Sequence, residues 1–144
     1  MKINVLSRTL CFLAFAYFVP GISTSLAMDL IVVVDNIKSD QGNIRLALFN
    51  NAKDFPKVFN HKDIIAARIG SVSFTIKDLS PGAYAVSAIH DLNGNESLDK
   101  NFVGMPVEPY GFSLNARGIF GPPDFVDAAI QLNEPVKSIT FSVK

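Results

Sequence analysis

The sequence is poor in the side chains that most catalytic and metal sites require. Its 144 residues include one cysteine, two histidines and no tryptophan. Cys11 lies near the N-terminus, so the rest of the chain can form no disulfide and has no thiol nucleophile. A transition-metal site would need more histidine or cysteine ligands than this. We therefore expect stability to come from packing, and we expect no site built on cysteine.

The chain also lacks an excess of charge of either sign. It has 13 basic and 13 acidic residues, and without Lys2 and Arg8 the basic count falls to 11 against the same 13 acidic residues. No basic cluster occurs anywhere in the sequence. Affinity for nucleic acid is built mainly on cationic contacts to phosphates. Nucleic acid is therefore excluded as an expected partner.

No hydrophobic run is long enough to span a bilayer. The longest, residues 10–19, is half of the roughly 20 residues that a membrane-spanning helix needs. Lys2 and Arg8 precede it, and Pro20-Gly21 and Ser25-Leu26-Ala27 follow it. A basic start, a short apolar stretch and a small-x-small site are typical of a secretory signal peptide, with an uncleaved N-terminal anchor as the alternative.

This N-terminal pattern predicts how the chain is divided and where it goes. We expect residues 1–27 to be a signal peptide and residues 28–144 to be a single domain without a transmembrane segment. The protein is then exported, either to the periplasm or to the cell surface or medium. No small residue precedes Cys11 closely enough for a lipoprotein signal, which argues against lipid attachment.

What the sequence does contain is period-two alternation of apolar and polar residues. Residues 44–48, 71–77 and 138–143 alternate in this way, which is typical of half-buried strands. Residues 30–34 and 84–89 are continuous apolar runs, as expected for central strands. Residues 64–69 and 128–132 are weaker candidates, and a short helical turn is expected near residues 55–59. About seven strands predict an all-β fold, a two-sheet immunoglobulin-like or transthyretin-like sandwich, with a small barrel as the alternative.

Residues 101–127 form a long connection in which aromatic residues alternate with glycine and proline. Structureless loops of this length are usually functional or disordered, and five aromatic residues argue against disorder. We expect an ordered flap, and two interpretations remain open. Its aromatic side chains either close one end of the sandwich or form a binding surface. The candidate surface residues are His90, Tyr110, Phe112, Arg117 and Phe120.

Part of this region resembles a known bacterial family. The His90-Asp91 pair, the Asn-Gly-Asn run that ends at Leu98-Asp99, and the blocks at residues 110–113, 115–118 and 121–125 are similar to the family called Domain of Unknown Function 2141. The resemblance covers most of residues 28–144 and implies an exported all-β domain, with no established activity. Many relatives have glycine where this chain has Glu96. A weaker resemblance, at residues 79–84, is to transthyretin-like and carboxypeptidase-regulatory-like sandwiches.

The loop "HDLNGNESLD", residues 90–99, has oxygen-bearing side chains at alternate positions. Asp91, Asn93, Asn95 and Asp99 are of the ligand types that calcium prefers, and their spacing resembles the start of an EF-hand loop. The bidentate glutamate of that motif is absent, because position 102 is Phe. Such residues also cap their own backbone in turns. A weak calcium site, with calcium as the one expected cofactor, and a metal-free polar turn are both open interpretations.

The sequence shows no catalytic motif such as a G-x-S-x-G elbow, a phosphate-binding glycine loop or an H-E-x-x-H helix. The remaining enzymatic alternative is a carboxylate-based hydrolase using Asp124 and Asp127. For Arg117 we expect an ion pair with Glu108 or Asp124, or contact with an anionic ligand. The favoured function is not enzymatic. It is an envelope binding or structural module, or alternatively a carbohydrate- or peptide-binding module that uses the flap to hold an envelope glycan or protein.

Overall fold

The structure is a computed structural model that describes residues 26–144. Almost all of the expected signal peptide, residues 1–27, lies outside the described residues. In chain order the elements are β1 (Met28–Ile37), β2 (Asn43–Phe49), β3 (His61–Ala66), β4 (Gly70–Leu79), β5 (Gly82–Asp91), β6 (Tyr110–Phe112), the 3₁₀ turn η1 (Ser113–Asn115), α1 (Phe125–Ala128), β7 (Ile130–Leu132) and β8 (Val136–Ser142).

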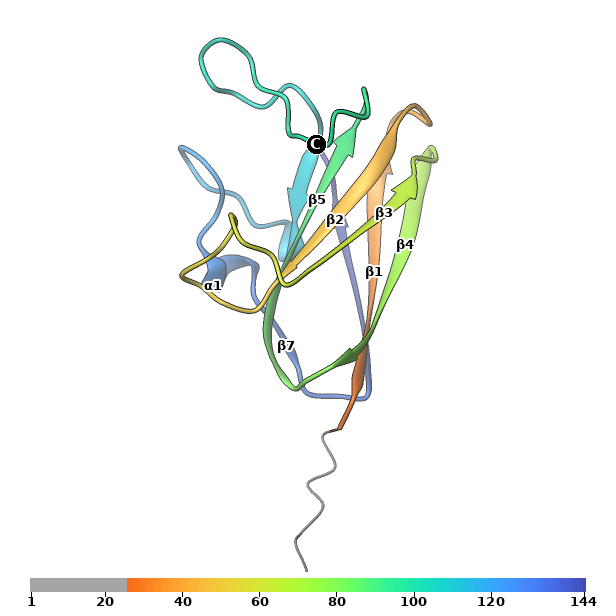
Figure 1. Cartoon of the computed structure of the whole chain (residues 1–144), viewed down its shortest axis with the longest axis vertical. Coiled ribbons are helices and arrows are strands. Elements are labelled where there is room, and N and C mark those ends of the chain that lie inside the picture. The colour runs from red at the N-terminus through yellow and green to blue at the C-terminus, as the bar shows by residue number, and fades with distance from the viewer. Residues whose placement is uncertain (1–25) are drawn as a thin grey trace, which may run out of the picture.

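The strands form two sheets that pack face to face, so the prediction of an all-β two-sheet sandwich is confirmed (Figure 1). The first sheet has the order β4-β1-β8, in which β1 pairs antiparallel with β4 and parallel with β8. The second has the order β3-β2-β5-β6, with β7 paired to the start of β5. β2 and β5 therefore lie in the centre of the second sheet, and their outer face is available to form a site.

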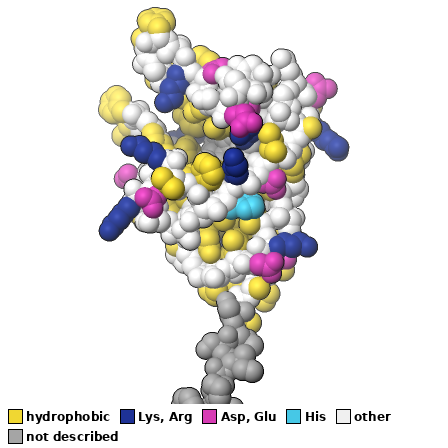
Figure 2. All heavy atoms as spheres, in the orientation of Figure 1, with side chains coloured by type: hydrophobic (Ala, Val, Ile, Leu, Met, Phe, Trp, Pro, Cys, Tyr) yellow, Lys and Arg dark blue, Asp and Glu magenta, His cyan; other side chains and the backbone are white. Residues whose placement is uncertain are grey.

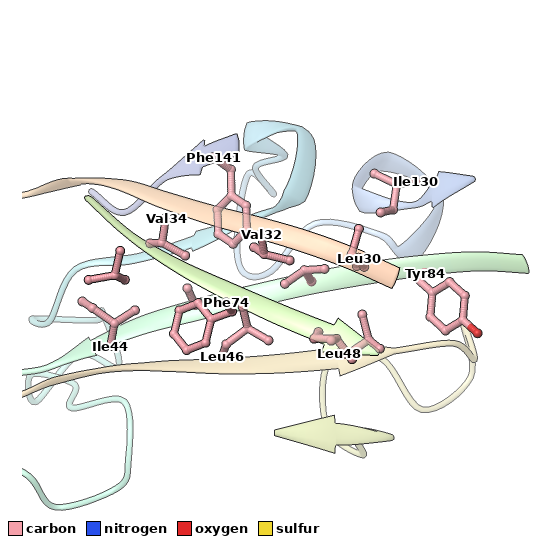
Figure 3. Packing of buried hydrophobic residues seen from close by; sticks show 14 of the residues in the cluster. Leu30, Val32, Val34, Ile44, Leu46, Leu48, Phe74, Tyr84, Ile130 and Phe141 are labelled. Atoms are coloured by element: carbon pink, nitrogen blue, oxygen red, sulfur yellow. The ribbon is translucent and has the colours of Figure 1, made fainter. Parts of the chain in front are cut away.

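The core lies between the sheets and follows from the alternation in the sequence. Leu30, Val32 and Val34 of β1 point from the first sheet toward Ile44 and Leu46 of β2, and all five are at most 2% exposed (Figure 3). Because successive side chains of a strand point to opposite faces, the residues between them face outward. β8 adds Phe141 to the same cluster, β4 adds Phe74, and β7 adds Ile130 and Leu132. Residues 28–143 thus contain both sheets and the entire described core.

Three expectations about local structure need correction. The weak segment at residues 64–69 forms a strand three residues earlier, as β3 (His61–Ala66). Residues 55–59 form no helix; the N–H groups of Lys57 and Val58 both donate to Asp54 O, which closes a turn. The strand β6 was not expected at all. It has three residues, too few for alternation to be visible, and Gly111 at its centre has no side chain.

A second, smaller core fixes the base of the flap against the outer face of the second sheet. Phe49, Ala85, Phe112 and Ala128 are buried together, and the Phe55 ring makes edge contacts with Phe49 and Phe112. Close approach of β6 to β8 requires glycine at position 111, because a Cβ there would overlap the carbonyl oxygen of Ser142. The flap is therefore ordered at its base, as expected.

Buried Ser113 connects three elements at this base. Its Oγ accepts a hydrogen bond from the N–H of Val86 in β5 at 2.9 Å and donates to the carbonyl of Ala128 in α1. β6 ends at Phe112, so the Ser113 hydroxyl, in place of a backbone carbonyl of a strand partner, accepts the N–H of Val86. The Ser113 side chain thus connects β5 to both ends of the segment from residue 113 to residue 128.

Candidate functional site: a groove between two loop tips

The floor of the site is the outer face of the second sheet. The strand register places Arg45 of β2 opposite Ile89 of β5, and Ile89 opposite Tyr110 of β6. In the next row Ala47 lies opposite Ser87. All of these side chains are half-buried, whereas the neighbours that point inward are buried. The result is a mostly apolar strip along the middle of the sheet.

The first wall is a loop tip formed by residues 100–107, here called the first tip. Lys100 and Pro106 form an isolated antiparallel bridge at its base. Asn101 closes the turn, because its backbone N–H donates to Met105 O at 2.8 Å and its Oδ1 accepts the N–H groups of Val103 and Met105. The backbone is therefore held by hydrogen bonds, while Phe102 is 100% exposed.

The second wall is the loop tip formed by residues 116–123, here called the second tip. Its backbone folds back on itself so closely that a Cβ at Gly118 would overlap the carbonyl oxygens of Gly121 and Pro122. Glycine is thus required at position 118. The two residues that follow it, Ile119 and Phe120, are 91% and 103% exposed. Like Phe102, they are exposed to solvent at the end of a loop tip.

The two tips border a groove of about 810 Å³ whose floor is the strip on β5 and β6. Figure 2 shows this side of the molecule hollowed between two projecting loops, with hydrophobic side chains at the ends of both. The groove is lined by apolar side chains and glycine, with few polar groups. Its lining includes Ile89, Leu98, Val103, Met105, Pro106, Tyr110, Ile119, Phe120 and Pro122.

A second hollow of about 750 Å³ continues the groove across β2 and β3. The two share Pro56, Ser87, Ile89 and Leu98 as lining residues. Cationic side chains are gathered around them: Arg45, Lys57 and Lys62 line the second hollow, and Lys100 lines the groove. Asp63 and Glu96 also line the second hollow, so this surface has an apolar centre with side chains of both charges beside it.

The five candidate surface residues divide between this groove and the interior. Tyr110 and Phe120 line the groove, and Arg117 lies over the Tyr110 ring at 5.4 Å from its centroid. His90 is 1% exposed and is not available as a surface ligand group, while Phe112 lines the floor of the groove but is only 6% exposed.

The physical reason is the strand register. His90 lies opposite the core residue Ile44, so its side chain points inward, and its Nε2 contacts the carbonyl of Gln41 at 2.8 Å. The His90 backbone contacts the segment before β6, since its N–H donates to Pro109 O. Arg117 forms no ion pair within residues 26–144 and stacks on Tyr110 instead.

The Asp91 carboxylate organises the start of the polar loop. Asp91 is fully buried, and its two oxygens accept the N–H groups of Gly94, Asn95 and Glu96 at 2.7, 3.2 and 2.9 Å. Arg45 lies 3.7 Å from the same carboxylate and 3.2 Å from Glu96. Glu96 adopts a φ of 68°, a left-handed conformation that favours glycine. These contacts are those of a tight turn around a buried acid.

Two further acids complete the loop. Asp99 accepts the side-chain amides of Asn93 and Asn95, whose own Oδ1 atoms accept backbone N–H groups. Glu108, 5% exposed, accepts the N–H groups of Leu92 and Asp99 at 2.8 and 3.1 Å.

The structure thus brings the four expected calcium ligands into one loop, with N–H donors at all of them. Within residues 26–144 no three His, Cys, Asp or Glu side chains are placed to hold a metal ion. Two of the four expected calcium ligands, Asn93 and Asn95, are asparagines and are not of these residue types. That absence therefore does not test the expected site, and calcium binding stays a prediction.

The acids of the hydrolase alternative lie outside the groove. Asp124 immediately precedes α1 and Asp127 lies within it, both side chains are exposed, and the N–H of Asp127 donates to Asp124 O. Among the described residues that line the groove there is no carboxylate, histidine or cysteine. The lining therefore supplies mainly apolar contact surface, with Lys100 and Tyr110 as its titratable side chains.

Several residues of the groove and its two tips were not predicted from the sequence. Lys100, Phe102, Met105 and Ile119 carry much of the exposed surface of the tips. A signal was present in the form of large apolar residues next to glycine, in Phe102-Val103-Gly104 and Gly118-Ile119-Phe120-Gly121. Glycine favours turns, and a turn that points outward exposes its side chains.

The fold and site together define an all-β sandwich with an apolar groove on the outer face of one sheet. The chain belongs to the bacterial family described as "Uncharacterized protein conserved in bacteria (DUF2141)", whose model matches residues 32–140. The resemblance seen in the sequence is thereby confirmed. No curated protein and no solved structure matches the chain. In residues 26–144 no helix has the length and apolar character needed to cross a membrane.

Proposed function

We propose that this protein is an exported, non-enzymatic binding module of the bacterial envelope, and that it holds an apolar or amphiphilic ligand in the groove between its two loop tips. One observation carries the proposal. Phe102 and Phe120 are fully exposed at the ends of two ordered tips that border the same groove. Contiguous exposed apolar surface on a soluble domain usually marks an interaction site.

The chemistry of the lining favours some ligands over others. Sugar hydroxyls need hydrogen-bond partners when they leave water, and burying them without partners is unfavourable. The groove is lined mostly by apolar side chains and offers few such partners. Apolar side chains of a peptide, or other apolar groups, therefore fit it better than an envelope glycan. Lys100 is the charged residue among those that line the groove, which further favours a ligand that carries a negative charge.

Export is supported by the N-terminal pattern of basic residues, a short apolar stretch and a small-x-small site. The family match to bacterial proteins is compatible with it.

The groove is tested with a small anionic apolar dye, anilinonaphthalene sulfonate. We expect the folded protein to bind the dye and to increase its fluorescence. Replacement of Phe120 with Ser should weaken this binding, because the side chain lines the groove. Val136→Ser removes a similarly apolar side chain, 55% exposed, from the start of β8 and serves as the control. Equal binding by both variants would contradict the proposal.

The ligand class is tested by titration. Short apolar peptides and soluble cell-wall glycan fragments are each added to the protein while the Tyr110 ring signals are followed by NMR. The other tyrosine of the described residues, Tyr84, lies in the core between the sheets and serves as an internal reference. We expect shifts at Tyr110 with the peptides. Shifts with the glycan fragments alone would favour the carbohydrate-binding alternative.

A further inference from the structure

The ends of the two tips extend beyond the groove and share a chemistry of their own. Both project from the same side of the sandwich (Figure 1). Residues 100–107 contain Lys100 with Phe102, Val103, Met105 and Val107, and residues 116–123 contain Arg117 with Ile119 and Phe120. Neither segment contains an acidic residue. Each tip thus combines exposed large apolar side chains with one positive charge.

We propose that these two tips dock the protein onto an anionic lipid bilayer, with the apolar side chains inserted at the interface and Lys100 and Arg117 at the headgroups. Two features support a bilayer as the occupant. Apolar side chains surrounded by basic residues are the pattern by which peripheral proteins lie in the interface of anionic membranes. Figure 2 shows Lys and Arg side chains directly behind the hydrophobic ends of both loops.

Order in the tips makes them suited to insertion. Backbone polar groups that enter a membrane interface without partners are unfavourable, so an inserting loop must satisfy them internally. In the first tip the N–H of Gly104 donates to Asn101 O, and the Asn101 side chain accepts two more N–H groups. The exposed side chains are therefore presented by a preformed turn, and docking requires little additional ordering.

The inference deepens the proposed function and rests on it, since the same tips border the groove. A groove that opens between two membrane-bound tips faces the lipid, which is itself amphiphilic and anionic. Lys100 then contacts the anionic headgroup of the lipid, and the apolar lining contacts its apolar part. Docking by this face leaves the opposite sheet, β4-β1-β8, directed away from the bilayer.

The test uses residues 26–144, which contain the whole described fold, because the apolar run at residues 10–19 would itself partition into vesicles. The chain has no tryptophan, so Phe102→Trp and Phe120→Trp each introduce a single reporter. Val136→Trp is the matched control at an exposed site far from the tips. The vesicles are made of phosphatidylglycerol with phosphatidylethanolamine, or of phosphatidylcholine alone.

With the anionic vesicles we expect a blue shift and protection from acrylamide quenching for both tip reporters, and neither change for the control. Replacing Lys100 and Arg117 with Gln should weaken vesicle partitioning about fivefold per charge. Replacing Phe102 and Phe120 with Ser should weaken it at least about tenfold. Thermal unfolding of each variant checks that the fold is retained.

Three outcomes would overturn the inference: unchanged tip reporters with vesicles, equal shifts at Val136→Trp, or shifts that require a second protein copy and no lipid. Dye binding measured on the same samples separates the two proposals. Retained dye binding without vesicle binding overturns docking and leaves the groove proposal standing. Vesicle binding without dye binding supports docking and overturns the groove as a separate ligand site.

Discussion

The connection between β5 and β6 has two halves of opposite chemistry. Residues 92–99 are mostly polar: the side chains of Asn93, Asn95 and Asp99 bond within the loop, and backbone N–H groups of the segment donate to Asp91 and Glu108. Residues 100–107 are mostly apolar, and four of them, including Phe102, are large hydrophobic side chains exposed to solvent. The polar side chains of the first half hold its turn together, while in the second half Asn101 does so and the large apolar side chains stay free for a partner.

The difference shows why residue type alone misleads in loops. Clustered acids attract attention as a ligand site, but here their oxygens accept N–H groups of their own loop. Exposed hydrophobic residues are usually unremarkable one at a time. Together on two adjacent tips they are the stronger indication of an interaction site. Four measurements test this difference between the polar and the apolar half.

The largest effect is expected at the centre of the polar half. Asp91→Ala leaves three N–H donors and Arg45 without their buried partner, so the free energy of unfolding should fall by about 3–5 kcal/mol. Urea unfolding measures it. Asp99→Ala, at a less buried site, is the control and should lose about 1 kcal/mol. Equal losses at both positions would show that Asp91 does not organise the loop.

Glu108 joins the two ends of the polar half, and its replacement tests that connection. Glu108→Gln keeps one acceptor oxygen but turns an amide toward a backbone N–H, which should cost about 2 kcal/mol of stability. Glu134→Gln breaks an exposed ion pair with Lys137 and should cost no more than about 1 kcal/mol. Chemical denaturation of the two variants under identical conditions gives the difference, and a larger loss for Glu134→Gln would refute it.

The calcium prediction is tested by thermal unfolding in calcium, in magnesium and in chelator. A site with ligands from Asp91, Asn93, Asn95 and Asp99 requires a calcium-specific increase, equal to about 1.4 kcal/mol when calcium is ten times its Kd. The variant with Asp91 and Asp99 both replaced by Ala should then lose more stability in calcium than in chelator. Losses that are the same in both conditions would identify the loop as a metal-free turn.

The smallest change in stability is expected at the tips. Phe102→Ser and Phe120→Ser remove fully exposed side chains, so unfolding free energies should stay within about 0.5 kcal/mol of the parent while dye and vesicle binding fall. Phe112→Ala, in the same flap but buried, should lose about 3–5 kcal/mol. Differential scanning calorimetry compares the three. A large destabilisation at either tip would mean that its aromatic ring supports the fold.

Most of the sandwich could be predicted because its strands alternate with period two. β2, β4 and β8 keep apolar residues on one face, and the tight turns between strands contain glycine, proline and asparagine. β6 could not be predicted, because a three-residue strand centred on Gly111 has no alternation to detect. Its formation depends on its contact with β8.

The location of the site could be predicted from the sequence, but the residues that form it could not. Aromatic residues among glycines and prolines identified the flap as an unusual segment. Whether a given ring is inside or outside depends on register and on distant partners: Phe112 packs against Phe55, some 57 positions earlier in the chain, while Phe120 has no such partner among the residues of the two cores. Local sequence carries no information on those partners.

Pairing of β1 with β8 links the beginning of the described chain to its end, and Asn36 donates to Val143 O across 107 residues. Contacts of such long separation slow folding, because a large loop must close before they form. β1 is the central strand of its sheet, so one of its edges stays open until the last strand arrives. A nascent chain would therefore expose an apolar strand edge until nearly the end of its synthesis, and a bound chaperone would protect it from aggregation during that interval.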